Sequence, residues 1–142
     1  MRMAKLNEAA RGLIESGALA HLATVDADGS PQVAIVWVGL DGDQLVSAHL
    51  DHRQRKLANI RRDPRVTLSF ESTESDPYGM RHYLVIRGTA ELTEGGGPAL
   101  LARLAKTYIG PDAVFPPMPN PPEGFICHIT VDSVSGNGPW KD

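Results

Sequence analysis

Turn-forming residues break this chain of 142 residues into short segments. Glycine occurs 14 times and proline 11 times, and both residues favour turns and interrupt helices. Between these breaks the apolar residues alternate or form runs of strand length, a pattern typical of β-strands. The sequence therefore predicts a mainly β fold and argues against a helical bundle.

Six segments have the apolar pattern of strands, at residues 18–25, 32–39, 44–49, 66–70, 83–92 and 125–131. The turn-forming residues at 26–29 and 41–43 are few, so the strands beside them are expected to pair antiparallel. Gly88 interrupts the fifth segment and predicts a bulge or bend. This pattern favours a six-stranded antiparallel barrel with flanking helices, although a sandwich fits the same pattern.

Three helices are expected beside these strands. Apolar residues at helical spacing predict the first over residues 3–15. The second is predicted over residues 51–62, with Asp51 as its N-cap and Gln54 completing a capping box. A third opens at Gly95-Gly96-Gly97-Pro98 and closes at Gly110-Pro111. Residues 71–80 are expected to form a polar loop, and the six prolines of residues 111–122 predict an ordered loop or a lid.

Length and composition indicate a single globular domain over residues 1–142. The chain is 42% hydrophobic and 22% charged, which is ordinary for a folded domain. No apolar run reaches the length of a membrane span. The single cysteine, Cys127, rules out an internal disulfide, and its apolar strand predicts a buried, inert thiol. We expect a soluble cytoplasmic protein.

Positive charge is concentrated in one stretch of the sequence. Residues 53–65 hold six basic residues and one acid, a net charge of +5, whereas the rest of the chain sums to −8. Arg53, Lys56 and Asn59 follow one another at spacings of three, so their donors share a helix face. This predicts an anion site, and a phosphate-bearing cofactor fits the acidic remainder better than nucleic acid does. A solvated basic face with salt bridges remains the alternative.

Other kinds of chemistry lack their usual signatures. The sequence has no G-x-S-x-G, G-x-x-x-x-G-K-[ST] or G-x-G-x-x-G motif. His49 and His52 have no third ligand at useful spacing, so no metal site is predicted. Trp37 and Trp140 could each stack on a flat ring, with core packing as the alternative for Trp37.

The order of several motifs resembles one protein family. These motifs are Leu22-Ala23-Thr24-Val25 followed by Asp28-Gly29-Ser30-Pro31-Gln32, Arg55-Lys56 leading to Asn59-Ile60-Arg61-Arg62-Asp63-Pro64-Arg65, Arg87-Gly88-Thr89-Ala90-Glu91-Leu92, and Gly138-Pro139-Trp140. Together they resemble the pyridoxamine 5′-phosphate oxidase-like split β-barrel superfamily, and within it the branch that uses coenzyme F420, a deazaflavin. The resemblance extends over nearly the whole chain.

The resemblance implies a homodimer with cofactor sites between the protomers. It assigns the cofactor phosphate to Lys56, with Arg53, Arg55 and Asn59 as neighbouring donors. Further cofactor contacts are implied from two strands and from the partner protomer: Ile35, Val36, Trp37, Ser47, Ala48 and His49 from the strands, and Tyr83 and Trp140 from the partner.

The activity that the resemblance implies is hydride transfer between the reduced deazaflavin and an unsaturated small-molecule substrate. His49 is the candidate proton donor, with water as the alternative. Two other functions remain open: an FMN-dependent oxidase or reductase of the same fold, and a non-catalytic carrier of flavin or deazaflavin.

Overall fold

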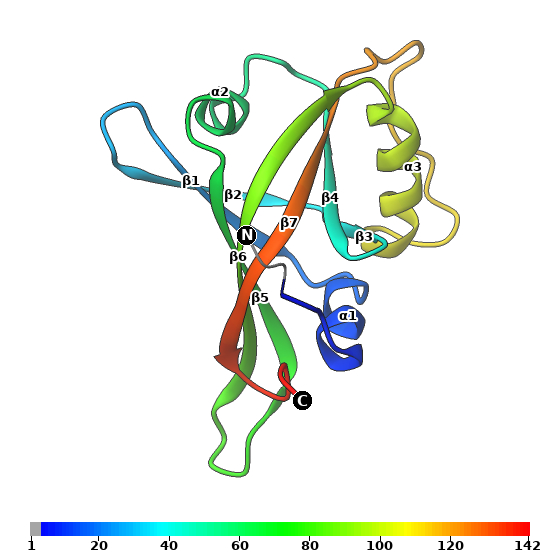
Figure 1. Ribbon diagram of the computed structural model, residues 1–142. Coiled ribbons are helices and arrows are strands. Elements are labelled where there is room, and N and C mark those ends of the chain that lie inside the picture. Colours follow the sequence, from blue (N-terminus) through cyan, green and yellow to red (C-terminus); the bar gives the residue numbers. More distant parts are fainter. Residues whose placement is uncertain (1–3) are drawn as a thin grey trace.

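The computed structural model describes residues 4–142, and within them seven strands form one antiparallel sheet (Figure 1). The strands follow the order β2-β1-β5-β6-β7-β4-β3. Their bounds are β1 (Ala20–Val25), β2 (Pro31–Val36), β3 (Gly39–Asp41), β4 (Gln44–His49), β5 (Arg65–Ser75), β6 (Arg81–Glu94) and β7 (Phe125–Asn137). The prediction of a mainly β fold is confirmed.

The two edges of the sheet are strands that follow one another in the chain. Only Trp37 and Val38 separate the end of β2 from the start of β3, so the two edges lie within about 11 Å of each other where this link joins them. The sheet must therefore curl into a barrel that this link closes. The count of six strands was wrong, because the predicted strand over residues 32–39 is divided by this link into β2 and β3.

A tyrosine from a helix compensates for the interrupted ladder. The Tyr108 hydroxyl accepts a hydrogen bond of 3.0 Å from the backbone N–H of Val38 and lies 3.1 Å from the Val38 carbonyl and 3.2 Å from that of Ala18. Val38 is buried, and an unpaired backbone group there would be costly. The N–H and carbonyl groups of Val38 are therefore paired with the Tyr108 side chain instead of with a neighbouring strand.

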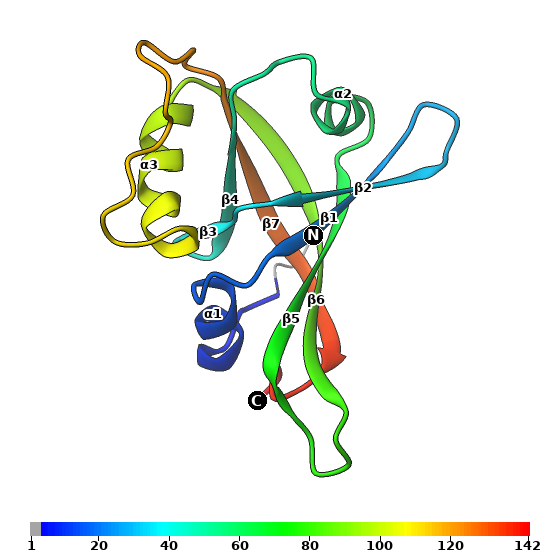
Figure 2. The ribbon, with the colours of Figure 1, turned by 180° about the vertical axis from the view of Figure 1, so that it is seen from behind.

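Three helices pack against the barrel: α1 (Glu8–Ile14), α2 (Arg55–Arg62) and α3 (Gly97–Tyr108). Figures 1 and 2 show α2 beside the β1–β2 hairpin and α3 alongside β4. Leu57, Asn59 and Ile60 of α2 are buried, while Leu100 and Leu104 of α3 pack on the outward side of β4 in a second, smaller apolar cluster. Helices α2 and α3 therefore lie on the two sides of one region of the barrel.

Two helices begin later than the sequence predicted. Asn7 is the N-cap of α1, because its side chain accepts a hydrogen bond from the Ala10 backbone; Met3, within the predicted range, lies outside the described residues. Asp51 does not cap α2, since its carboxylate bonds the backbone and side chain of Arg53, and the helix begins only at Arg55. The third helix was predicted correctly, with Pro98 in its first turn.

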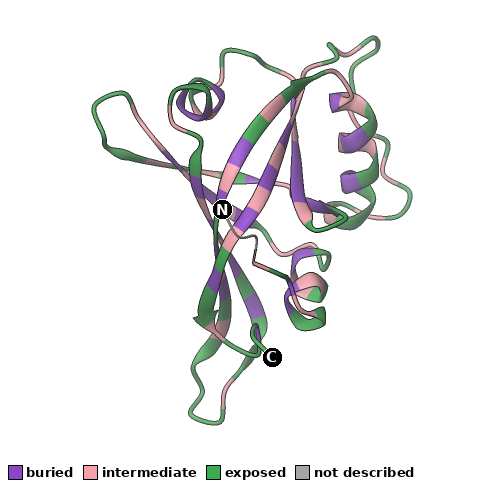
Figure 3. Cartoon of the chain, viewed as in Figure 1, coloured by how far each residue is buried: buried purple, intermediate pink, exposed green. Residues whose placement is uncertain are grey.

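The β5–β6 hairpin is longer than predicted. Residues 71–75 belong to β5 and β6 begins at Arg81, so the predicted loop over residues 71–80 is reduced to a tight turn. The hairpin projects away from the barrel (Figure 1) and its far end is exposed (Figure 3). The predicted irregularity at Gly88 is confirmed by a register shift against β7 between Arg87 and Gly88.

The main core lies inside the barrel. Its largest fully buried side chains include Phe70, Ile14 and Leu22, and buried positions alternate with partly or fully exposed ones along the strands (Figure 3). Cys127 is completely buried, as predicted, and burial raises the pKa of its thiol to about 11. In the described part of the chain no helix is long and apolar enough to cross a membrane.

Candidate functional site

A cavity of about 220 Å³ opens at the end of the barrel between α2 and α3. The first turn of α2 faces the ends of β2 and β4 there, and α3 and the proline-rich segment complete the wall. Six lining residues are among those that the resemblance assigned to the cofactor: Ile35, Val36, Trp37, Ala48, His49 and Lys56. Gln54, Leu101 and Phe115 also line it. The fold therefore brings together half of the predicted site.

Trp37 forms an aromatic wall of the cavity. Its ring stacks on Tyr108 with centroids 5.5 Å apart and an interplanar angle of 10°, and it meets Phe115 at 5.1 Å and 58°. Tyr108 is itself fixed by its hydrogen bonds to the link between β2 and β3. Trp37 thus packs against protein rings, as the alternative interpretation expected, and presents only the rest of its surface to the cavity.

His49 and Ser47 form a buried pair at the C-terminal end of β4. Ser47 Oγ and His49 Nε2 share a hydrogen bond of 2.8 Å, and the two residues are 1% and 5% exposed. Ser47 does not line the cavity. Burial, and secondarily the charge of Lys56, lower the pKa of His49 to about 4, against a weaker opposing effect of Gln54. His49 is neutral at pH 7 as a result, which argues against its expected use as a proton donor.

Lys56 differs from the other basic residues of the stretch 53–65. Arg53, Arg55 and Arg65 each pair with an acid, Asp51, Asp26 and Asp63 respectively. Arg62 donates to the Val25 carbonyl and to Asn59, and Arg61 lies 5.0 Å over the ring of Phe125. Within residues 4–142, Lys56 makes no ion pair, and partial burial lowers the pKa of its amine. The salt-bridged interpretation therefore describes three of the five arginines in this stretch, and Lys56 is the cation at the cavity without a partner.

Asn59 lies on another side of α2 from the cavity. Its Nδ2 donates to Thr24 Oγ1 at 3.0 Å and to Asp26 Oδ1 at 2.9 Å, and its Oδ1 accepts from Arg62 at 2.8 Å. Both amide hydrogens are used within the protein, so neither is left for a phosphate. The structure gives Asn59 a different position from the one that the helical spacing predicted.

The residues expected to approach from a partner lie at the other end of the molecule. Trp140 packs into the core of its own chain with 6% exposure, and its Nε1 donates to the Tyr83 carbonyl at 2.7 Å. Tyr83 is 46% exposed on β6. A buried Trp140 is poorly placed to stack on a ligand held by another chain, whereas Tyr83 keeps an open surface.

Three residues of the cavity were not predicted from the sequence. Leu101 and Phe115 come from α3 and the proline-rich segment, far along the chain, and no local pattern could have placed them here. Gln54 stands two residues before Lys56, which could have drawn attention to it. Its Oε1 is buried and, among the described residues, has no hydrogen-bond partner. The Gln54 side chain also interacts with His49 and opposes the fall in the pKa of that ring, so the cavity brings this amide, His49 and the unpaired Lys56 together.

Other described parts of the molecule offer no better candidate for the cofactor site. In the part of the chain that the structure describes, no group of three His, Cys, Asp or Glu side chains is arranged to hold a metal ion. A larger cavity of about 570 Å³ lies on the outside of the sheet beside Arg65, Arg87 and Asp132. It contains none of the residues assigned to the cofactor, so its size alone does not make it the site.

Comparisons with known proteins support the fold. A family model described as pyridoxamine 5′-phosphate oxidase matches residues 6–136. A solved structure named F420 reductase is 30% identical, with a TM-score of 0.71, over 88% of this chain and 94% of that protein. The conserved hypothetical protein Rv2991 from Mycobacterium tuberculosis is 21% identical, with a TM-score of 0.68, over 95% of this chain and 86% of that protein.

A heme binding protein from Mycobacterium smegmatis is 25% identical, with a TM-score of 0.62, over 93% of this chain and 53% of that protein. No curated protein matches the chain. The fold is thus shared by proteins whose names give different ligands.

Proposed function

The chain belongs to the pyridoxamine 5′-phosphate oxidase family, and we propose that it is an oxidoreductase dependent on coenzyme F420. The unpaired, partly buried Lys56 at the cavity is the observation that carries the proposal. A phosphate there gains a charge-assisted hydrogen bond that no carboxylate of the chain already takes. The 30% identity to a protein named F420 reductase favours the deazaflavin over other ligands of the fold.

The donors and acceptors around the cavity fit such a cofactor. Lys56 supplies a cation for the phosphate, the Gln54 side chain supplies a polar group beside it, and Trp37 and Leu101 supply apolar surface. When bound, the deazaflavin would supply a hydride to an unsaturated substrate. The chain's own residues bind and orient the reactants and exclude water, and neutral His49 adds no charge beside them.

One chain encloses too little space for this ligand. Sites for ligands of this size are about 300–1,000 Å³, whereas the cavity is about 220 Å³. We therefore propose a homodimer in which a second protomer completes the wall.

The outward face of β1 and β2 suits such an interface. Val33 and Ile35 are 59% and 58% exposed there and pair with Ala23 and His21 in the register of the two strands. This places apolar side chains side by side on a single face, the kind of surface that associates by two-fold symmetry.

Titration of the purified protein with F420 and with FMN, followed by fluorescence, tests the proposed cofactor. F420 is expected to bind more tightly, and its affinity is expected to fall as salt rises because the contacts are ionic. Lys56→Ala is expected to weaken binding by roughly 1.5–3 kcal/mol. The control is Lys106→Ala, an exposed lysine of α3 that does not line the cavity. Tighter FMN binding that salt does not affect would overturn the choice of cofactor.

Two further measurements separate the remaining candidates. Oxidation of reduced F420 by a panel of neutral conjugated acceptors distinguishes an enzyme from a carrier, which would bind the cofactor without turnover. Hemin added under the same conditions tests the ligand of the Mycobacterium smegmatis relative. No Soret shift is expected, because His49, the histidine that lines the cavity, is buried and already bonded to Ser47. A shift that is lost in His49→Gln would favour heme instead.

A further inference from the structure

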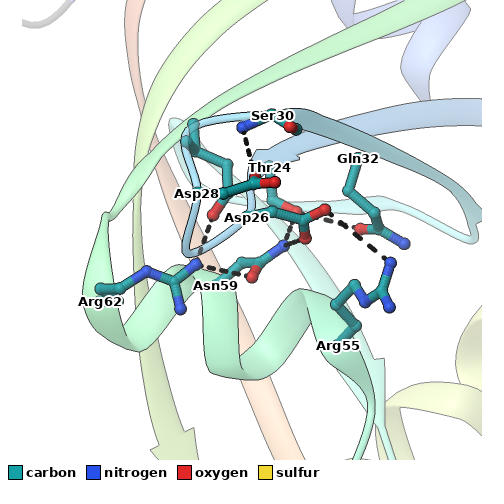
Figure 4. Close-up of polar contacts among 9 residues, drawn as sticks. Thr24, Asp26, Asp28, Ser30, Gln32, Arg55, Asn59 and Arg62 are labelled. Carbon is teal, nitrogen blue, oxygen red and sulfur yellow. Dashed lines mark hydrogen bonds and ion pairs between the residues drawn. The ribbon is translucent and has the colours of Figure 1, made fainter.

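One edge of α2 is bound to the β1–β2 hairpin by polar side chains (Figure 4). Arg55, Asn59 and Arg62 follow at spacings of four and three, so they lie along the same edge of the helix. Arg55 pairs with Asp26 at 3.8 Å, and Arg62 donates to the Val25 carbonyl at 2.7 Å. The helix therefore contacts the hairpin along its whole length.

Asn59 is the centre of this contact. It is 2% exposed, as is Thr24, and it bonds three side chains from two elements: Thr24, Asp26 and Arg62. The Thr24 hydroxyl in turn donates to Gln32 Oε1 of β2 at 3.1 Å. A satisfied buried network fixes geometry, because each member leaves a costly unpaired group if it moves.

The other contacts of α2 do little to fix the rotation of the helix about its own axis. The helix has eight residues, and its N-cap residue Gln54 makes no side-chain capping bond. Leu57 and Ile60 bury its apolar side, but apolar contacts are not directional. Lys56 lies between this apolar side and the edge of Asn59, since successive residues are about 100° apart around a helix. A small rotation of α2 would therefore move Lys56 relative to the cavity.

We propose that Asn59 is a positioning residue, which fixes the rotation of α2 through Thr24 and Asp26 and thereby holds Lys56 at the cavity. Asn59 touches no ligand in this arrangement, because its amide hydrogens are used by the hairpin. The β1–β2 hairpin therefore influences the anion site although none of its atoms contacts the anion. The proposal rests on the proposed function only in requiring that Lys56 binds the anion.

A double-mutant cycle distinguishes a positioning role of Asn59 from direct contact with the ligand and from a purely structural role. With F420 as the probe, Asn59→Ala is expected to raise Kd about tenfold in the wild-type background and less than about twofold in Lys56→Ala, because coupled residues are not additive. Equal effects in both backgrounds would overturn the proposal, since Asn59 would then act independently of Lys56.

The partner on the hairpin offers a rescue by a conservative variant. Thr24→Val removes the hydroxyl with little change in shape and is expected to reproduce the loss of Asn59→Ala, whereas Thr24→Ser keeps the hydroxyl and is expected to retain affinity. Thr67→Val is the matched control, because Thr67 lies opposite Ala23 on the neighbouring strand β5 and outside this network. Equal losses in Thr24→Ser and Thr24→Val would contradict the proposal.

A measurement without cofactor tests the same point if F420 does not bind. The chain has four lysines, and Lys56→Ala assigns the Lys56 amine in spectra of protein carrying isotope-labelled lysine. Its pKa is expected below that of free lysine in wild type and Thr67→Val, and raised in Asn59→Ala and Thr24→Val, where the amine returns to water. Circular dichroism confirms that each variant is folded. An unchanged Lys56 pKa in folded Asn59→Ala would overturn positioning, whereas failure of F420 to bind wild type would overturn only the proposed cofactor.

Discussion

At the scale of single residues, His49 shows how burial decides the use of a titratable group. Its ring is held between Ser47 and the cavity, close to the charge of Lys56. Both desolvation and a neighbouring cation disfavour the imidazolium ion. The residue type suggested a proton donor, but the environment favours a neutral ring.

This environment predicts how stability depends on pH. An unfolded histidine takes up a proton near pH 6.5, whereas His49 in the folded chain does so only near pH 4. The unfolded state binds more protons in this window, so stability is complete above pH 6.5 and falls as the pH drops towards 4, by roughly 3 kcal/mol from this group. Urea unfolding at a series of pH values measures the loss.

His49→Gln is the comparison, because glutamine can keep a hydrogen bond to Ser47 but does not titrate. Its stability is expected to fall less than that of wild type between pH 7 and pH 4. Parallel losses in the two proteins would show that His49 is not responsible.

The sequence predicted which residues lie at the site better than it predicted which residues they contact. Lys56, Trp37 and His49 were placed at the cofactor by the resemblance, and they line one cavity. Asn59 was placed beside Lys56 by helical spacing, yet it faces the hairpin. Spacing gives the angle of a side chain around the helix axis, but not the element that packs at that angle.

At the scale of secondary structure, the bulge between β6 and β7, at which Asp132 of β7 has no partner in the register, depends on a residue without a side chain in β6. A Cβ at Gly88 would lie 2.6 Å from both the Ile129 Cγ2 atom and the Thr130 carbonyl oxygen of β7. The carbonyl oxygen belongs to the backbone of a paired strand and cannot move without disturbing the ladder. The close approach of β6 and β7 therefore requires glycine at this position.

Gly88→Ala is expected to destabilise the protein by about 1–3 kcal/mol, the usual range for overpacking. Gly12→Ala is the control, since a Cβ there meets nothing within 4 Å and alanine favours the interior of helix α1. Thermal or urea unfolding of both variants measures the difference. A neutral Gly88→Ala would mean that the two strands can separate without cost.

The extents of the elements were harder to predict than their existence. Residues 71–75 are rich in Glu, Ser and Thr, and they extend β5 with exposed side chains apart from the buried Ser72, so no alternation of apolar residues marks them. Asp51 has the chemistry of an N-cap, but Arg53 competes for its carboxylate. In both places the sequence pattern was compatible with more than one local structure.

At the scale of the whole molecule, the proposed dimer predicts the effect of a charge on the outer face of β2. Val33→Asp is expected to convert a dimer to a monomer and to weaken F420 binding, because an unpaired charge in an apolar interface is costly. Light scattering coupled to size-exclusion chromatography measures the mass. Val114→Asp is the control, at 88% exposure in the proline-rich segment. A wild-type monomer that binds F420 tightly would contradict the dimer.

The link between β2 and β3 limits how proteins of this shape can change their ligands. Trp37 belongs both to the wall of the cavity and to the two residues that close the barrel, so a new side chain there alters ligand contacts and closure together. Leu101 and Phe115 line the cavity but do not take part in closing the barrel, because α3 and the proline-rich segment pack on its outside. We expect evolution of new specificity to use those two positions first and to leave the tryptophan in place.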